Sequence, residues 1–185
     1  MLKYYFFIVV FASAFYSCNT TGGDTLFTIL DKDKTGINFQ NTIYEEEKLN
    51  VVYYSYFYNG GGVAIGDINN DGLQDILFTG NMVRNRLFLN KGNWKFEDIT
   101  DKSGVAKKQG WCTGATMADV NADGKLDIYI CRSLDVNPLM RENLLFINNG
   151  DLSFTEKGRE MGLADAGYST HSSFFDYDKD GDLDC

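Results

Sequence analysis

Residues 67–75 read DINNDGLQD, and the same nine-place pattern returns as DVNADGKLD at residues 119–127 and as DYDKDGDLD at residues 176–184. We name these segments loop 1, loop 2 and loop 3. Each carries an Asp or Asn at places 1, 3, 5 and 9 and a Gly at place 6, where a tight turn needs a residue that tolerates positive φ. The loops begin 52 and 57 residues apart, close to the spacing of propeller-blade repeats. The pattern therefore predicts a repeat protein with one oxygen-rich turn in each repeat.

The donors in each loop suit a calcium ion, which takes roughly six to eight oxygen ligands, whereas Mg²⁺ demands a tighter octahedron. Side chains at places 1, 3, 5 and 9 are the expected ligands. Place 7 varies in chemistry, so its backbone carbonyl is expected to bind. The predicted ligands are Asp67, Asn69, Asp71, Leu73 and Asp75 in loop 1; Asp119, Asn121, Asp123, Lys125 and Asp127 in loop 2; and Asp176, Asp178, Asp180, Asp182 and Asp184 in loop 3. We expect about three Ca²⁺ sites, the third of them incomplete.

Two other interpretations of the loops fit their sequences less well. An EF-hand opens in the same way but needs a Glu at place 12 and flanking helices. Here place 12 is Phe78 or Ile130, within β-branched and aromatic runs that read as strands. The loops could also be turns that bind nothing, since Asp-Gly is a common hairpin signal. Three copies in register, holding 11 of the 26 acidic residues, favour a bound cation, because crowded carboxylates repel one another.

Each repeat extends beyond its loop. Residues 85–99 (NRLFLNKGNWKFEDI) and 143–157 (NLLFINNGDLSFTEK) both read as a strand, an Asn-x-Gly turn and a second strand. With the strands on either side of the loop, each repeat holds four short antiparallel strands, the content of one propeller blade. We assign repeat 1 to residues 59–113, repeat 2 to 114–170 and the start of repeat 3 to 171–185. A closed ring needs more blades, so we expect a fragment of a longer protein.

These motifs resemble a known family. The loops are similar to those of FG-GAP (VCBS) repeats, found in integrin alpha-chain propellers, and NGGGVAIGDINNDGLQDILFTGN at residues 59–81 resembles the cartilage-acidic-protein-like group. The resemblance covers residues 27–185. It implies an all-β fold of β-propeller blades, here an incomplete ring, with loop acids that bind structural Ca²⁺. The Phe-Gly-Gly-Ala-Pro signature is degenerate, since GGVAIG, TGATMA and HSSFFD stand in its place.

Residues 27–58 precede the first repeat. FTILDKDKTGINF at residues 27–39 resembles residues 96–105 and 154–163, in which a Phe is followed eight or nine residues later by a Gly and an aliphatic residue. We read this segment as an outer strand that would complete the last blade of a closed ring. VVYYSYFY at residues 51–58 is an aromatic insert. On a strand its alternate tyrosines would share one face, either exposed to a sugar or protein ligand or, as we favour, packed on the first blade.

The N-terminus reads as an export signal. Residues 1–17 contain one Lys and then a 13-residue apolar stretch, shorter than the roughly 20 residues of a membrane span. Cys18 follows directly and opens a polar tether, residues 18–26. An apolar stretch followed by Cys and polar residues resembles a bacterial lipoprotein signal, although residues 15–17 depart from its usual pattern. We expect a lipid anchor at Cys18, the only expected membrane contact. The protein would be a cell-surface or outer-membrane lipoprotein, or secreted if the signal is cleaved in the ordinary way.

Other candidate residues carry less information. Cys112 and Cys131 flank loop 2 on strands that should pair, so either a disulfide or two buried thiols would fit. His171, followed by two serines, invites a hydrolase reading, but adjacency in sequence is no sign of a catalytic triad. A net charge of −9 without a basic cluster disfavours nucleic acid, so we expect no nucleic-acid partner.

The whole pattern predicts an exported calcium-binding β-propeller that acts as a binding or adhesion scaffold for an unidentified protein or glycan. The alternative is part of a secreted or surface enzyme that acts on polysaccharide and has its active residues elsewhere. A fold alone does not decide between these functions.

Overall fold

The structure, a computed structural model, describes residues 26–108, 110–134 and 137–185. The chain divides into two units, Met1–Leu30 and Asp31–Cys185. In the first unit the described residues 26–30 lie in irregular, exposed chain. The predicted signal segment, the lipidation site Cys18 and the tether up to residue 25 lie outside the described residues.

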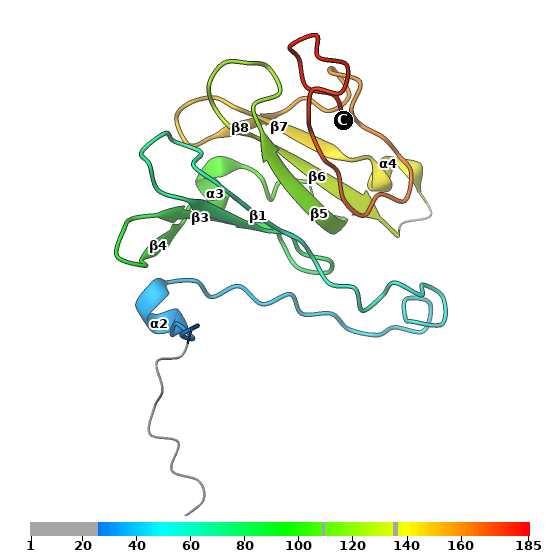
Figure 1. Ribbon diagram of the computed structural model, residues 1–185. Coiled ribbons are helices and arrows are strands. Elements are labelled where there is room, and N and C mark those ends of the chain that lie inside the picture. The colour runs from blue at the N-terminus through cyan, green and yellow to red at the C-terminus, as the bar shows by residue number, and fades with distance from the viewer. Residues whose placement is uncertain (1–25, 109, 135–136) are drawn as a thin grey trace, which may run out of the picture. The chain divides into compact units, whose positions relative to one another are not determined.

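The second unit contains two four-stranded antiparallel sheets, each with its strands in chain order (Figure 1). The first sheet, blade 1, consists of β1 (Val63–Gly66), β2 (Asp75–Phe78), β3 (Arg86–Asn90) and β4 (Phe96–Asp98). The second sheet, blade 2, consists of β5 (Trp111–Ala118), β6 (Asp127–Ser133), β7 (Leu144–Asn148) and β8 (Phe154–Glu156). This is the predicted all-β class, and each sheet has the strand content of a propeller blade.

Strand register repeats from one sheet to the next. Gly66 pairs with Asp75 across loop 1, and Ala118 pairs with Asp127 across loop 2. The equivalent pair of the third repeat, Phe175 and Asp184, forms an isolated antiparallel bridge. The last residues of the chain therefore enter a third hairpin in the register of the first two.

The main hydrophobic core lies between the two sheets. Leu77 and Leu87 of blade 1 are fully buried and pack in one cluster with Ile128 and Ile130 of blade 2. Leu77 occupies a buried place in the alternating pattern of β2, whereas its two apolar neighbours in that strand are less buried. One face of each sheet thus covers the other sheet, as stacked blades require.

Among the described residues, three helical turns connect or precede the strands: α2 (Lys32–Thr35), α3 (Thr100–Ser103) and α4 (Pro138–Arg141). Both α2 and α3 end at a left-handed glycine, Gly36 at φ 79° and Gly104 at φ 80°. The sequence similarity of residues 27–39 to residues 96–105 therefore reflects the same helical turn and glycine stop. No helix in the described ranges has the length and hydropathy of a membrane-spanning segment.

The aromatic insert does not form a strand. Residues 51–58 are a series of turns, so the alternate tyrosines do not line one strand face. Phe57 is fully buried and lies 5.3 Å from Trp111 between ring centroids, and Tyr54 meets the same indole edge-on at 5.8 Å. Tyr56 and Tyr58 remain 59% and 61% exposed. The insert is thus anchored by two rings and presents others to solvent.

Candidate metal centres

Loops 1 and 2 join the first two strands of their blades, β1 to β2 and β5 to β6, as the strand-like flanks indicated. Loop 3 lies within the Phe175–Asp184 bridge. In each loop place 4 and place 6 have positive φ: Asn70 at 58° and Gly72 at 86° in loop 1, with Ala122 and Gly124 at 56° and 81° in loop 2. Two left-handed residues so close together turn the chain back on itself within nine residues.

The carboxylate at place 1 holds the turn. Asp67 accepts hydrogen bonds from the backbone N–H groups of Asp71 at 3.1 Å and Gly72 at 2.7 Å. The corresponding distances at Asp119 in loop 2 are 3.0 and 2.8 Å. In loop 3, Asp176 accepts from the place-6 glycine at 3.2 Å. The same side chain therefore sets the same turn in all three loops.

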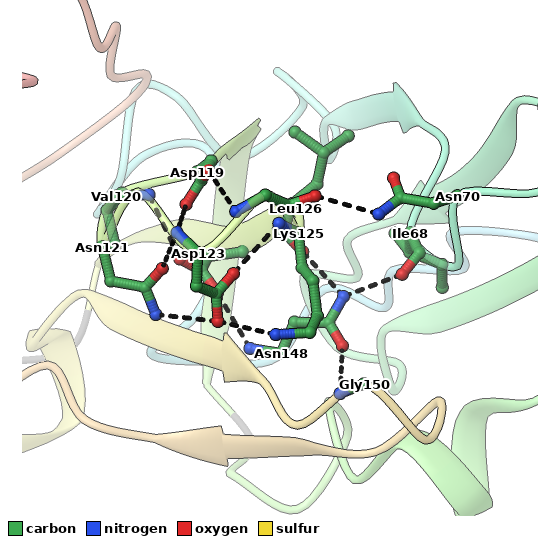
Figure 2. Close-up of polar contacts among 12 residues, drawn as sticks. Ile68, Asn70, Asp119, Val120, Asn121, Asp123, Lys125, Leu126, Asn148 and Gly150 are labelled. Atoms are coloured by element: carbon green, nitrogen blue, oxygen red, sulfur yellow. Dashed lines mark hydrogen bonds and ion pairs between the residues drawn. The ribbon is translucent and has the colours of Figure 1, made fainter.

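Places 3 and 5 complete this internal pattern. In loop 2 Asn121 accepts from the N–H of Asp123 at 3.0 Å, and Asp123 accepts from the N–H of Lys125 at 3.0 Å. Figure 2 shows the side chains of Asp119, Asn121 and Asp123 together inside the loop. Each carboxylate oxygen has more than one lone pair, so these bonds leave acceptor capacity for a cation.

In loops 1 and 2 the carboxylate at place 9 is buried and ties the loop to the next hairpin. Asp75 is fully buried; it accepts from the N–H of Ile68 at 3.0 Å and from the N–H of Asn90 at 2.7 Å. Asp127 is equally buried, with the equivalent distances 3.1 and 2.8 Å. Burial raises the pKa of both carboxyls; the two N–H groups oppose this rise, and the carboxylates at places 1 and 5 add to it. A divalent cation would offset the cost of keeping these groups ionised.

Loop 2 contains a cation of its own. The ammonium of Lys125, at place 7, donates to Oδ2 of Asp123 at 2.8 Å. This hydrogen bond lowers the pKa of Asp123 and raises the pKa of Lys125. A calcium ion entering loop 2 would compete with this ammonium for Asp123, while the place-7 carbonyl would remain available.

Loop 3 concentrates the most charge. Oxygens of Asp176, Asp178 and Asp184 lie within 4.8 Å of one another. In the described residues this is the one group of three His, Cys, Asp or Glu side chains close enough together to hold a metal ion. These are places 1, 3 and 9, and loops 1 and 2 carry Asn at place 3, so they have one carboxylate fewer there. Repulsion from neighbouring Asp180 is the largest cause that raises the pKa of Asp182.

Two kinds of residue at the loops were not predicted from the sequence. Asn90 and Asn148 each open an Asn-x-Gly turn, and the sequence pattern predicts only a hairpin there. In the structure the backbone N–H of each Asn also donates to the place-9 carboxylate of its blade. Asn70 at place 4 donates its side-chain amide to Gly124 of loop 2 at 2.9 Å. The recurrence of Asn at the same place in both hairpins was the available signal for the first kind.

The other candidates lie away from this geometry. Cys112 and Cys131 are both free and 1% exposed; Cys112 packs in the core between the blades and Cys131 in a second cluster with Tyr129 and Leu145. Burial is the largest cause that raises the pKa of Cys112 to about 11. This arrangement is that of two buried thiols. His171 stands beside Gly114, where a Cβ on that glycine would lie 2.7 Å from the ring Nδ1.

Residues 67–130, which run from loop 1 through loop 2 into β6, match the FG-GAP-like repeat family, and the blades with their acidic loops are consistent with that match. The chain is similar to cartilage acidic protein 1 from three vertebrates. It is 32% identical to that protein of Xenopus tropicalis over 117 residues, which are 62% of this chain and 18% of the relative. It is 38% identical to the Mus musculus protein over 69 residues and 38% identical to the Homo sapiens protein over 72, which are 37% and 38% of this chain and 11% of each relative. The chain thus spans less than a fifth of the length of these relatives.

Proposed function

We propose that loops 1 to 3 bind Ca²⁺ and that the protein is an exported calcium-binding β-propeller that serves as a binding or adhesion scaffold. The observation that carries the calcium role is the common loop geometry, in which place 1 closes the turn and place 9 is a buried or bridging carboxylate. The match to FG-GAP-like repeats supports this role. The ligands would be the places predicted from the sequence, with the carbonyl of Leu73, Lys125 or Asp182 at place 7.

Calcium would act structurally. Each ion would offset two of the three to five negative charges of its loop and hold the first two strands of its blade together. Because the assembled loop exists only in the folded chain, binding would stabilise that chain in proportion to the logarithm of free Ca²⁺ above the dissociation constant. The millimolar Ca²⁺ outside cells suits weak extracellular sites, which agrees with export.

Calorimetric titration of the full chain with Ca²⁺ tests this role. Asp71→Ala and Asp123→Ala should each lower the stoichiometry by about one ion, because each removes the place-5 ligand of one loop. Asp151→Ala is the matched control: this exposed Asp lies in the turn between β7 and β8 and accepts from the N–H of Ser153 at 2.9 Å. Unchanged stoichiometry in both loop variants would contradict the assignment.

The ligand of the scaffold would meet an exposed surface such as the aromatic insert, where Tyr53, Tyr56 and Tyr58 are 70%, 59% and 61% exposed. Tyrosine offers a flat apolar ring with a polar end, which suits a glycan or a protein partner. Binding to a glycan array without release of products would support the scaffold, whereas turnover of a polysaccharide would support the enzyme alternative. For the anchor, metabolic fatty-acid labelling should be lost in Cys18→Ala; labelling retained in that variant would refute it.

A further inference from the structure

Asn148 lies between loop 1 and loop 2 and contacts both (Figure 2). It ends β7 and is 3% exposed. Its side-chain Nδ2 donates to the carbonyl of Ile68 in loop 1 at 2.8 Å and to the carbonyl of Leu126 in loop 2 at 3.0 Å. Its Oδ1 accepts from the N–H of Gly150 at 2.9 Å. Both amide donors and the acceptor are thus engaged, so the side chain has one fixed orientation.

Asn70 makes a second connection, in the opposite direction. It is place 4 of loop 1, and its Nδ2 donates to the carbonyl of Gly124 at place 6 of loop 2 at 2.9 Å. Gly124 and Leu126 are the two neighbours of Lys125, whose carbonyl is the predicted place-7 ligand. The carbonyls on either side of that ligand are therefore both held by hydrogen bonds. Asn70 of loop 1 holds the carbonyl of Gly124, and Asn148, which also contacts loop 1, holds that of Leu126.

Loop 1 is constrained in return. Asn148 holds the carbonyl of Ile68, whose own N–H donates to the place-9 carboxylate of Asp75 at 3.0 Å. An ion that fixes the ligands of one loop would therefore restrict the carbonyls that shape the other. A second ion then meets a loop that has already lost part of its conformational freedom, and such coupling is reciprocal.

We propose that loops 1 and 2 form one coupled calcium-binding unit in which Asn148 and Asn70 are the positioning residues. This inference rests on the proposed calcium function. Ca²⁺ binding at loop 1 raises the Ca²⁺ affinity of loop 2, and binding at loop 2 raises the affinity of loop 1. The factor is about threefold to tenfold, which corresponds to the net free energy of one ordinary hydrogen bond.

Blade 1 offers a matched control for Asn148. Asn90 occupies the equivalent place: its Nδ2 donates to the carbonyl of Gln74 at 2.9 Å and its Oδ1 accepts from Gly92 at 2.9 Å. These are the bonds that Asn148 makes within its own blade; in the described chain Asn90 makes none to a neighbouring loop. Asn90→Ala therefore removes the hairpin contacts alone, while Asn148→Ala removes them together with the contact between loops.

The test follows each loop separately in the full chain by the amide NMR signals of Gly72 and Gly124 during Ca²⁺ titration, since each amide donates to the place-1 carboxylate of its own loop. Silencing loop 1 with Asp71→Ala should raise the Ca²⁺ midpoint of Gly124 about threefold to tenfold. In an Asn148→Ala or Asn70→Ala background the same silencing should raise that midpoint by a smaller factor, because only one of the two connections remains. In an Asn90→Ala background the full effect should persist.

Asn70→Ala keeps the experiment decisive if Asn148→Ala fails to fold. Loop 2 itself carries Ala122 at place 4 with φ 56°, so alanine is compatible with this backbone. Asn93→Ala is the control for replacing a left-handed Asn by Ala, because Asn93 is exposed at φ 52° in the turn between β3 and β4. A Gly124 midpoint that is the same with and without loop 1 would overturn the coupling but leave the calcium sites. If neither glycine signal responds to millimolar Ca²⁺, the proposed function falls and the coupling with it.

Discussion

Thr79 joins the two blades, and replacing its hydroxyl tests how they hold together. The side chain is fully buried, accepts from the N–H of Gly62 at 2.6 Å and donates to the carbonyl of Thr113 in blade 2 at 2.5 Å. Thr79→Val keeps the shape but leaves that N–H and that carbonyl without their partner. Each unpaired group costs about 1–3 kcal/mol when buried, and these two are half-buried, so we expect a loss of about 2 kcal/mol.

Thermal or urea unfolding at fixed Ca²⁺ measures this loss, and about 2 kcal/mol corresponds to a midpoint lower by about 4–8 °C for a chain of this size. Thr79→Ser is the decisive comparison, because it keeps the hydroxyl and removes one methyl group, worth about 1 kcal/mol. The valine variant should be the less stable of the two although it is larger and more apolar. A valine variant as stable as the serine variant would refute the role of this hydroxyl between the blades.

Two further predictions concern titratable groups. In the native protein Cys112 and Cys131 should resist alkylation at pH 8 and react after unfolding, because both thiols are buried; peptide mapping that finds them joined in a disulfide would contradict the structure. Burial acts to raise the pKa of Asp98, but hydrogen bonds from Thr100 and Arg86 outweigh it and lower that pKa. A carboxyl group whose pKa is lowered by folding stabilises the fold fully above its unfolded-state pKa of about 3.9, and this contribution is lost as the pH falls through the folded-state pKa. Urea titrations should therefore show that Asp98→Asn loses less stability than the parent protein between pH 6 and 3. An equal loss in both proteins would refute it.

The loop turns and the hairpins could be predicted from the sequence because their causes are local. In loop 2 the turn depends on Asp119 reaching an N–H four and five residues later, and on a glycine at positive φ. The pairing of Asn148 with Phe154 follows from a short Asn-x-Gly turn between two apolar runs. Such information lies within a few residues and is repeated three times for the loops.

The cysteines and the tyrosine insert show where this local information ends. Cys112 and Cys131 lie on paired strands, as expected, but a register shift between Cys112 and Ala115 accompanies their placement in different hydrophobic clusters. Residues 51–58 have strand-forming composition, yet they form turns with Phe57 buried against Trp111. Packing against a distant ring outweighed local β-propensity, which is a weak preference that depends on context.

By itself the sequence determined a β-repeat protein with three acidic turns of one design, because residue type and spacing within nine positions set both the backbone turn and the oxygen donors. Only the tertiary structure decided which loops touch. Asn148 reaches Ile68, a residue 80 positions earlier, and Asn70 reaches Gly124, because two blades stack face to face and bring their loops together at one edge. Contacts of that kind depend on the angle and register between sheets, which are settled by packing of the shared core and have no signature in either loop.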